Sequence, residues 1–412
     1  MKIALLAITD RGLTTALRIG ENLPSSMAPT LYLHEKAIPK MITSEDKERE
    51  GSIPIRIFQR LGDLVPALWQ EGSVLIFIMA SGIVVRKIAS LIDRKDRDPA
   101  VLVLDEAGKF VIPLLSGHLG GANAWARLIA KQIDAQAVIT TATDGRGIIA
   151  PDEYARRFGW KVEPVDHLPA VNRLLLEEKV LKVVTPYILS IDPTLLDDPH
   201  YCFSVGHGRG KSLDYLNCRG EGDQSRNGMK DSLDNHALDN HNVGNIKAED
   251  EANVIIDAFP KRDIPANCIY LIPPVLSVGV GCRRGVSGTV VLERITEDME
   301  KIGASLKAIS GIYSIDLKAD EEGLRKAAQS LGVDFQTFSA AELQTAINQE
   351  QLTRSNFVME KIGVDGVCEA ASILGAHKGQ LILPKTKGQG VTVAISIANS
   401  LSWDSDPEIL NT

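Results

Sequence analysis

A histidine lies among three glycines in the stretch LLSGHLGGAN, which runs from Leu114 to Asn123. An apolar run precedes this stretch and an amphipathic segment follows it, so we predict a strand, a glycine-rich loop and a helix. Glycine permits positive φ angles and the close approach of a ligand to the backbone. We therefore predict that a ligand meets this loop and that His118 is a general base working near neutral pH.

The neighbours of His118 could support such chemistry. The side-chain amide of Asn123 could donate a hydrogen bond to a carbonyl oxygen, or Asn123 could be only the N-cap of the helix. A loop histidine could likewise do no more than bond to a backbone carbonyl. Ser116 lacks the G-x-S-x-G setting of a hydrolase nucleophile. We assign ligand binding in this loop to Ser116, Gly117, Gly120 and Gly121.

Two other predicted strands also end in small residues before a helix, at Ser81-Gly82 and at Gly279–Gly285. Ligands of open α/β sheets bind at the carboxyl ends of strands, and helix N-termini attract anions. Basic side chains near these turns would suit a ligand with several carboxylates or phosphates. They are Arg86, Lys87, Arg283 and Arg284. We interpret the loop Arg94–Asp98 as a solvated charged segment with local ion pairs.

The hydrophobic pattern predicts that strands and helices alternate along most of the chain. Strands are predicted at 1–7, 74–80, 100–104, 110–115, 137–139, 180–184, 201–205, 253–259, 275–280, 381–384 and 391–395, and within GIYSIDL. Helices are predicted from about residue 12 and at 61–70, 81–92, 122–133, 153–157, 168–178, 287–301 and 368–374, with another after Ala319–Asp320. The turn DEAGK indicates a hairpin. This alternation predicts an α/β fold of three consecutive modules with mainly parallel sheets.

A chain of 412 residues is too long for a single hydrophobic core. We predict an N-terminal α/β domain at 1–140 that carries the SGHLGGAN loop, a middle α/β domain at 141–271 and a C-terminal α/β domain at 272–400. The segment 206–252 is rich in Gly, Asn, Asp and Ser and poor in aliphatic residues. We predict that it is a disordered insertion whose histidines are solvated.

The composition excludes several classes of protein. A net charge of −8 argues against nucleic-acid binding, and no stretch of 18 apolar residues predicts a membrane span. The apolar run at the N-terminus is too short for a secretion signal, so we expect a cytoplasmic protein. Five scattered cysteines predict neither a disulfide framework nor a zinc site. Neither the glycines of GVGCRRG nor the segment GHGRGKS has the spacing of a nucleotide-binding motif.

Several longer stretches resemble one known family. ASGIVVRKIASLIDRKDRDPAVLVLDEAGKFVIPLLSGHLGGANAWARLIA, with TTATD after it, resembles the N-terminal half of the cobalt-precorrin-5A hydrolase (CbiG) family of anaerobic cobalamin biosynthesis. VGVGCRRG, IDLKADEEGL, GVCEAASIL and LPKTKGQGVTVAIS resemble its C-terminal domain, which is also similar to the CobE protein of the aerobic pathway. The resemblance covers nearly the whole chain apart from 206–252.

The resemblance implies a hydrolase that acts on a cobalt-bearing, ring-contracted tetrapyrrole. It implies that water opens the ring-A δ-lactone of cobalt-precorrin-5A and that acetaldehyde leaves, which gives cobalt-precorrin-5B. The carboxylates of this substrate fit the basic strand ends, and Gly281 and Lys318 join the predicted binding residues. The resemblance assigns no catalytic residues, so we propose Asp105, Glu106 and Glu369 as candidate proton donors for the release of the aldehyde.

Expectations for cofactors and partners follow from the same resemblance. No cofactor is expected, because cobalt arrives inside the substrate. The expected partner is the tetrapyrrole, without nucleic acid or membrane, while hand-over to other corrin-pathway enzymes and a homodimer stay open. The alternative function is a non-catalytic tetrapyrrole carrier of the same pathway, and acetaldehyde release would separate the two. A nucleotide-dependent enzyme is the third alternative.

Overall fold

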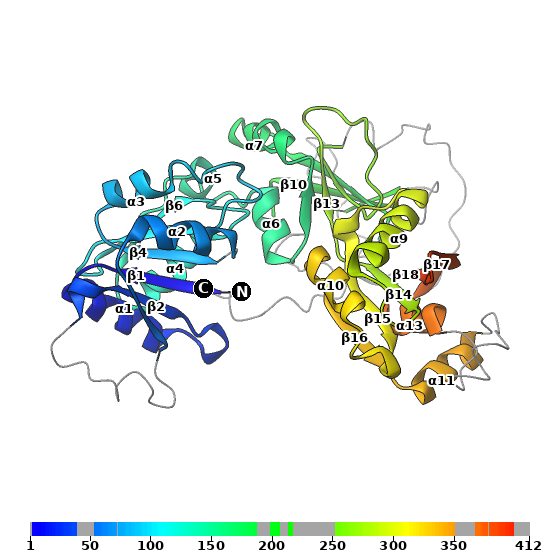
Figure 1. Ribbon diagram of the computed structural model, residues 1–412. Helices are drawn as coiled ribbons and strands as arrows, with labels where there is room; N and C mark the ends of the chain where they lie inside the picture. Colours follow the sequence, from blue (N-terminus) through cyan, green and yellow to red (C-terminus); the bar gives the residue numbers. More distant parts are fainter. Residues whose placement is uncertain are drawn as a thin grey trace. The chain divides into compact units, whose positions relative to one another are not determined.

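The computed structural model describes residues 2–38, 53–71, 73–187, 198–206, 213–216, 252–350, 367–377 and 379–398. It contains three β-sheets with flanking helices, divided between two compact units (Figure 1). The first unit contains Met1–Arg157 with one sheet, and the second begins at Phe158 and contains the other two sheets. The predicted α/β fold with mainly parallel sheets is confirmed. The predicted domain bounds stay a prediction.

The first unit is built on a seven-stranded sheet with the order β3-β2-β1-β4-β5-β6-β7. The strands are β1 (Ile3–Ala7), β2 (Thr30–His34), β3 (Ile55–Phe58), β4 (Val74–Ile78), β5 (Val101–Leu104), β6 (Phe110–Leu115) and β7 (Gln136–Ala137). Neighbours are parallel except β5 and β6, which form the predicted hairpin. The apolar runs of β1, β4 and β5 are buried throughout, as expected for strands covered on both faces.

Helices cover both faces of this sheet. Helices α1 (Asp10–Asn22) and α4 (Ala122–Gln132) share one core cluster with the sheet, which includes Ile19 and Trp125. Helices α2 (Leu61–Gln70) and α3 (Ser81–Ile88) share the other cluster, on the opposite face. Two short helices, α5 (Ala142–Gly145) and α6 (Pro151–Arg157), end the unit.

The direction of β6 determines where the glycine-rich loop lies. Because β6 runs antiparallel to β5, its last residue Leu115 pairs with Val101 at the start of β5. The loop after Leu115 therefore lies at the edge of the sheet where the parallel strands begin. Ligands of open α/β sheets usually bind at the other edge, where the parallel strands end.

The second unit begins with a six-stranded sheet of order β11-β10-β9-β12-β13-β8. Its strands are β8 (Lys161–Glu163), β9 (Leu181–Thr185), β10 (Tyr201–Gly206), β11 (Leu213–Leu216), β12 (Val254–Ile256) and β13 (Ile269–Ile272), and helix α7 (Leu168–Leu176) precedes β9. The four central strands are parallel, and β8 and β11 pair antiparallel at the edges. Within the predicted insertion 206–252, strand β11 and the two end residues are described, and the remainder lies outside the described residues.

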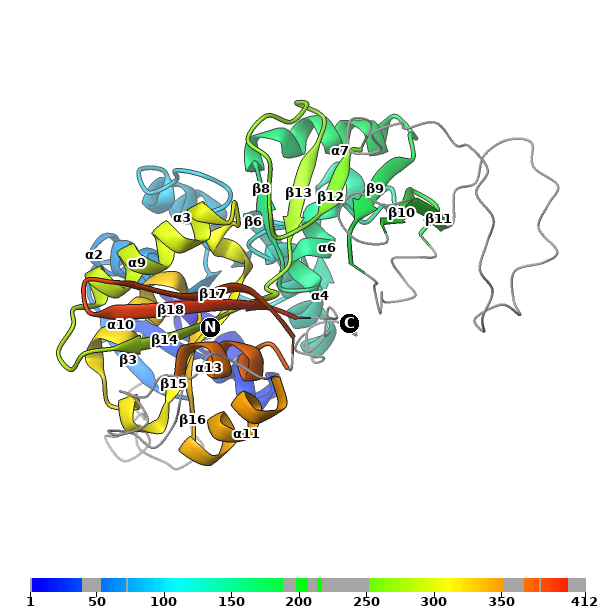
Figure 2. The same cartoon turned by 90° about the vertical axis from the view of Figure 1, so that its right-hand side faces the viewer.

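A five-stranded sheet of order β16-β15-β14-β18-β17 completes the second unit. Its strands are β14 (Leu276–Cys282), β15 (Ile309–Ile315), β16 (Asp334–Phe338), β17 (Gln380–Gly388) and β18 (Val391–Ile397). Strands β14, β15 and β16 are parallel, whereas β17 and β18 are antiparallel additions. The helices are α9 (Gly288–Lys301), α10 (Glu322–Leu331), α11 (Ala340–Glu350) and α13 (Val367–Gly375). Figure 2 shows α9 and α13 on opposite sides of the strands β14 and β18.

The glycines of GVGCRRG correct one prediction. We expected them to form a turn after the strand, but Gly279 and Gly281 lie inside β14. A Cβ on Gly279 would lie 1.8 Å from the carbonyl oxygen of Cys368, so this glycine lets α13 pack directly on β14. A Cβ on Gly281 would lie 2.7 Å from Oγ1 of Thr392 on β18. Both positions are thus occupied by neighbouring protein atoms.

The sequence did not predict β2, β3, β8, β13, β16 or α11, all of which the structure contains. Cys202 is disulfide-bonded, which the scattered cysteines did not predict either. None of the helices in the described part of the chain combines the length and apolar character needed to span a bilayer.

Candidate active site around His118

The glycine-rich loop folds back and caps helix α4 with its own carbonyl groups. Three N–H groups at the start of the helix donate to the loop: Gly121 to His118 at 2.9 Å, Ala122 to Ser116 at 3.1 Å and Asn123 to Gly117 at 3.0 Å. These bonds satisfy helix N–H groups that otherwise have no partner within the helix. The N–H of Gly121 is therefore already used and cannot donate to a substrate oxygen.

The glycines allow the compact fold of this loop, and the approach of a ligand to it stays a prediction. A Cβ on Gly120 would lie 2.5 Å from the Cβ of Ser116, and a Cβ on Gly117 would lie 2.8 Å from Oδ1 of Asn123. Gly121 has a φ of +80°, in the left-handed region that favours glycine. Side chains at these positions would collide with the loop itself or strain its backbone.

The imidazole of His118 lies between two carboxylates. Its Nε2 atom is 2.9 Å from Oδ2 of Asp144, and its Nδ1 atom is 3.4 Å from Oδ2 of Asp152. All three side chains are largely buried, with 14% exposure for His118 and Asp144 and 6% for Asp152. Since both ring nitrogens face acceptors, the ring is arranged to carry two N–H groups and a positive charge.

The charge of His118 follows from a balance of two effects. Burial alone would lower its pKa, because it disfavours the charged ring. Hydrogen bonds to Asp144 and Asp152, together with the charges of these carboxylates, outweigh burial and raise the pKa of His118 to about 10. The histidine is therefore an imidazolium at neutral pH, which does not fit the predicted role of general base.

Asp144 collects the hydrogen bonds that stabilise this arrangement. Its carboxylate accepts from His118, from Nδ2 of Asn123 at 2.9 Å, from the hydroxyl of Thr141 and from the guanidinium of Arg127. Burial alone would raise the pKa of Asp144, but these bonds hold it well below its usual range. Asp144 is thus a permanently ionised partner of His118 and a poor base.

Asn123 has a role different from both of those considered for it. The N-cap of α4 is Gly121, so Asn123 does not cap the helix. Its Nδ2 atom donates to Asp144 and, at 3.0 Å, to Oγ1 of Thr141, which uses both amide hydrogens. It therefore has no donor left for a substrate oxygen. Its Oδ1 atom is buried and has no hydrogen-bond partner in the structure.

A cavity of about 190 Å³ opens beside His118. Its lining consists of His118, Arg127, Asp144, Gly147, Ile148, Ile149, Ala150, Glu153 and Arg157. His118, Asp144 and Asp152 interact strongly, and the pKa values of His118 and Asp144 are shifted. Such groups next to a cavity are typical of a functional site. This cavity is the candidate active site of the first unit.

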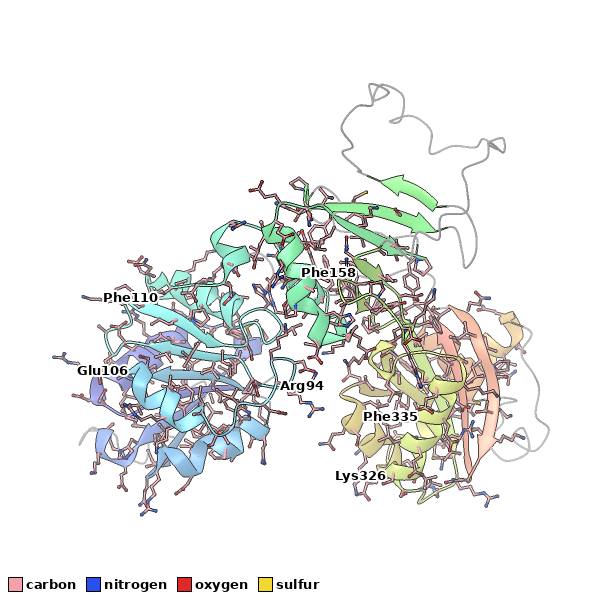
Figure 3. The ribbon with its side chains drawn as sticks, turned by 90° about the horizontal axis from the view of Figure 1, so that it is seen from above. Arg94, Glu106, Phe110, Phe158, Lys326 and Phe335 are labelled. Carbon is pink, nitrogen blue, oxygen red and sulfur yellow. The ribbon has the colours of Figure 1, made fainter. Side chains whose placement is uncertain are left out.

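Two other predicted residues of the first unit, Glu106 and Ser81, lie at the opposite edge of its sheet. Glu106 accepts a hydrogen bond at 2.9 Å from Oγ1 of Thr9, which follows β1, and Ser81 follows β4. A strand rises about 3.3 Å per residue, so the length of β6 separates this edge from His118 by roughly 20 Å. Figure 3 shows Glu106 and Arg94, which precedes β5, on opposite sides of the unit. Glu106 is therefore not a proton donor beside His118.

The basic residues near Ser81 and in the loop before β5 are largely solvated. Arg86 is exposed and donates at 2.8 Å to the carbonyl of Gly82 on its own helix, and Lys87 is exposed as well. In the loop before β5, Arg94 pairs with Asp96 and Arg97 pairs with Asp93, as the local ion pairs predicted there. Asp105 caps its own hairpin by accepting from the N–H groups of Lys109 and Phe110, both at 2.8 Å.

Two predicted binding residues of the second unit, Lys318 and Arg284, form ion pairs. Lys318 pairs at 3.1 Å with Glu321, whose other oxygen accepts from the N–H of Gly285 at 2.8 Å. This hydrogen bond lowers the pKa of Glu321. Arg284 pairs with Asp320 at 3.5 Å, and both side chains are exposed to solvent.

Two further candidates of this unit make backbone contacts. The backbone N–H of Arg283 donates to the carbonyl of Gly390 at 3.0 Å. Glu369 is 3% exposed at the start of α13 and accepts at 2.9 Å from the backbone N–H of Lys385. Both residues belong to the second unit, whereas His118 belongs to the first.

Sequence reasoning missed most partners of His118. Asp144 and Thr141 lie in the segment TTATD, which carries part of the family resemblance but was not assigned a role in the site. Asp152 and Glu153 lie in the first turn of α6, where acidic residues also favour the helix dipole. The signal that could have found them is the acidic residue in a polar turn directly after the last strand of the first sheet.

The fold and this site define a two-unit α/β protein with an ion-paired histidine beside a small cavity. Family models match along the chain: Cobalamin synthesis G N-terminal at 63–144, Cobalamin biosynthesis central region at 149–201 and Cobalamin synthesis G C-terminus at 276–396. The chain belongs to the CbiG family of cobalamin biosynthesis proteins, which confirms the resemblance.

Similar proteins support this assignment along nearly the whole chain. A protein of Priestia megaterium named cobalt-precorrin-5A hydrolase is 29% identical over 96% of this chain and 94% of its own length. A protein of the same name from Salmonella typhimurium is 28% identical over 96% of this chain and 98% of its own length. Protein CobE of Sinorhizobium sp. is 26% identical over 29% of this chain and 79% of its own length.

Proposed function

We infer that this chain is a hydrolase of cobalamin biosynthesis that acts on cobalt-precorrin-5A. The observation that carries this function is the match of its relatives: two proteins with this name align with 96% of the chain. The described structure adds a cavity with a buried ionic cluster at which hydrolysis can occur. The function is that of the enzyme rather than of a carrier for the same tetrapyrrole.

The reaction consumes one water molecule. The water oxygen adds to the carbonyl carbon of the ring-A lactone, and the ester C–O bond breaks to leave a carboxylic acid and a hydroxyl group. The hydroxyl then loses its proton and becomes the carbonyl of acetaldehyde, while the bond between its carbon and the macrocycle breaks. The electron pair of that bond stays on the macrocycle, which takes up a proton. Cobalt enters as part of the substrate, and we propose no resident cofactor.

We propose that His118 acts as a cation and proton donor in the first step. An imidazolium beside the cavity stabilises the negative charge that develops on the carbonyl oxygen when water adds. Its Nδ1–H has the longer of the two carboxylate contacts, 3.4 Å to Asp152, and is the proton we assign to the leaving oxygen. Asn123 and Thr141 are positioning residues, because they act through Asp144.

The remaining predictions concern residues of the second unit, the location of the enzyme and its partners. We propose that Gly281, Arg283, Arg284 and Lys318 contribute to binding of substrate carboxylates and that Glu369 supplies a proton. We also propose that the enzyme works in the cytoplasm and hands its product to other enzymes of the pathway. We propose that it can form a homodimer.

Acetaldehyde release from purified protein and cobalt-precorrin-5A tests the function. A coupled alcohol dehydrogenase assay measures the aldehyde through the loss of NADH absorbance. Wild-type protein should release one acetaldehyde per substrate, and His118→Asn should be slower by two orders of magnitude or more, about the contribution of one acid or base group. Glu106→Gln is the matched control at the other edge of the sheet. Substrate binding by wild type without acetaldehyde would show a carrier.

A further inference from the structure

The cavity beside His118 is too small for a whole tetrapyrrole. Its volume is about 190 Å³, whereas pockets that enclose drug-sized ligands hold about 300–1,000 Å³. A macrocycle must therefore stay outside, and only one of its side arms can enter.

The charge of the lining favours an anionic arm. Three cations line the cavity, His118, Arg127 and Arg157, against the two carboxylates of Asp144 and Glu153. Their direct partners Arg156 and Asp152 add one charge of each sign, so one positive charge remains in excess, in a chain whose net charge is −8. A single carboxylate would neutralise the lining, and a second would again unbalance it.

The two arginines come from different helices and keep donors for a ligand. Arg127, on α4, contacts Asp144 through one Nη atom, and its side chain is 40% exposed. Arg157, on α6, contacts Glu153 through Nε at 3.3 Å and is 30% exposed. A guanidinium has five N–H donors in a planar fork, so the contacts described for these two residues leave donors that match a carboxylate.

The surroundings of Arg157 strengthen this point. Arg156 already neutralises Glu153 by a bidentate pair, with Nε at 3.1 Å and Nη2 at 2.9 Å from its two oxygens. Arg157 makes only the single, longer contact with the same carboxylate, and the Tyr154 ring lies 6.0 Å from its guanidinium carbon. These contacts therefore position Arg157, while its positive charge is not fully neutralised by Glu153.

We propose that this cavity is a subsite for one carboxylate side arm of the tetrapyrrole and that Arg127 and Arg157 bind the carboxylate. The macrocycle lies outside the mouth of the cavity, and the arm brings the adjacent lactone to His118. This proposal rests on the proposed function for the identity of the ligand. It is separate from the predicted basic residues Arg86 and Lys87, which are exposed in the last turn of α3.

Binding of uroporphyrin, a porphyrin with carboxylate arms on every pyrrole ring, tests the subsite without any catalysis. The quenching of porphyrin fluorescence gives the Kd of the full-length chain at low and high salt. Arg157→Gln should weaken binding about tenfold, the effect of one lost charged hydrogen bond. Arg157→Lys keeps the charge but loses the fork, so an intermediate loss is expected. Salt should weaken the wild type more than Arg157→Gln.

Arg56→Gln is the matched control, because Arg56 is an exposed arginine of the same unit on β3, which is far from β6 in the strand order of the sheet. Its Kd should equal that of the wild type. An Arg157→Gln variant with native circular dichroism and a wild-type Kd would overturn the subsite, as would equal losses in both variants. Failure of the proposed function would look different: uroporphyrin would bind in an Arg157-dependent way, but cobalt-precorrin-5A would yield no acetaldehyde.

Discussion

Replacing His118 with asparagine removes the positive charge that Asp144 and Asp152 share, and should destabilise the first unit. The pKa of His118 is raised from 6.5 to about 10. At about 1.36 kcal/mol per pKa unit, this difference corresponds to about 5 kcal/mol of stabilisation at a pH where the ring is charged in both states. Loss of one partner from a buried ion pair costs about 3–5 kcal/mol in general, which is the same size.

The direction of the pH dependence follows from the sign of the shift. Between pH 6.5 and about 10 the folded protein binds a proton at His118 that the unfolded chain has lost. The stabilisation is therefore complete below pH 6.5 and is lost as the pH rises toward 10, by up to about 1.4 kcal/mol per pH unit. Asp144 behaves oppositely: its pKa is lowered from 3.8, so its contribution is present above that pH and is lost on acidification.

Hydrogen exchange of the α4 amides in urea, followed by mass spectrometry, measures the unfolding free energy of this unit. Wild-type protein should lose stability steadily from pH 7 to pH 9, and His118→Asn should be less stable at pH 7 with a flatter pH dependence. His34→Asn, in the same unit, is the matched control and should keep the wild-type slope. Equal slopes in the wild type and in His118→Asn would refute the assignment of a charged histidine.

Three further substitutions test the architecture of the site. Gly120→Ala should cost about 1–3 kcal/mol in thermal unfolding, because its Cβ would lie 2.5 Å from a loop side chain. Gly145→Ala, where a Cβ meets nothing within 4 Å, is its control. Asn123→Ala should lower kcat with little change in KM, since it positions an ionised partner of the histidine; an altered KM alone would contradict this role. Glu106→Gln should leave acetaldehyde release unchanged, and a tenfold loss would place that residue in the site after all.

The elements that could be predicted from the sequence are those defined by local composition. Strands β1 and β4 are five-residue apolar runs buried throughout, and α4 has clear helical periodicity. Strand β16, with the sequence DFQTF and partly exposed throughout, gives no such signal, and β8 has only three residues. These short strands form because they pair with neighbours far along the chain, which local pattern cannot show.

The site was predictable only in part for the same reason. His118 could be singled out because its glycines lie beside it in the sequence, but Asp144 comes 26 residues later and reaches it through the packing of α5. The predicted role of His118 as a general base does not fit the structure, because the protonation state of the ring depends on its environment. Two carboxylates determine that environment, and only the fold brings them together.

The pH profile of acetaldehyde release tests most directly the central claim that a charged His118 performs the hydrolysis. The rate should be measured from pH 5.5 to pH 9 for the wild type, with the His118→Asn profile subtracted to remove the contribution of hydroxide. If His118 acts as a cation, kcat should stay level across this range, because the pKa of about 10 keeps the ring protonated throughout. A kcat that rises with a midpoint near pH 6.5 and then levels off would show a neutral imidazole acting as a base, and would contradict the account.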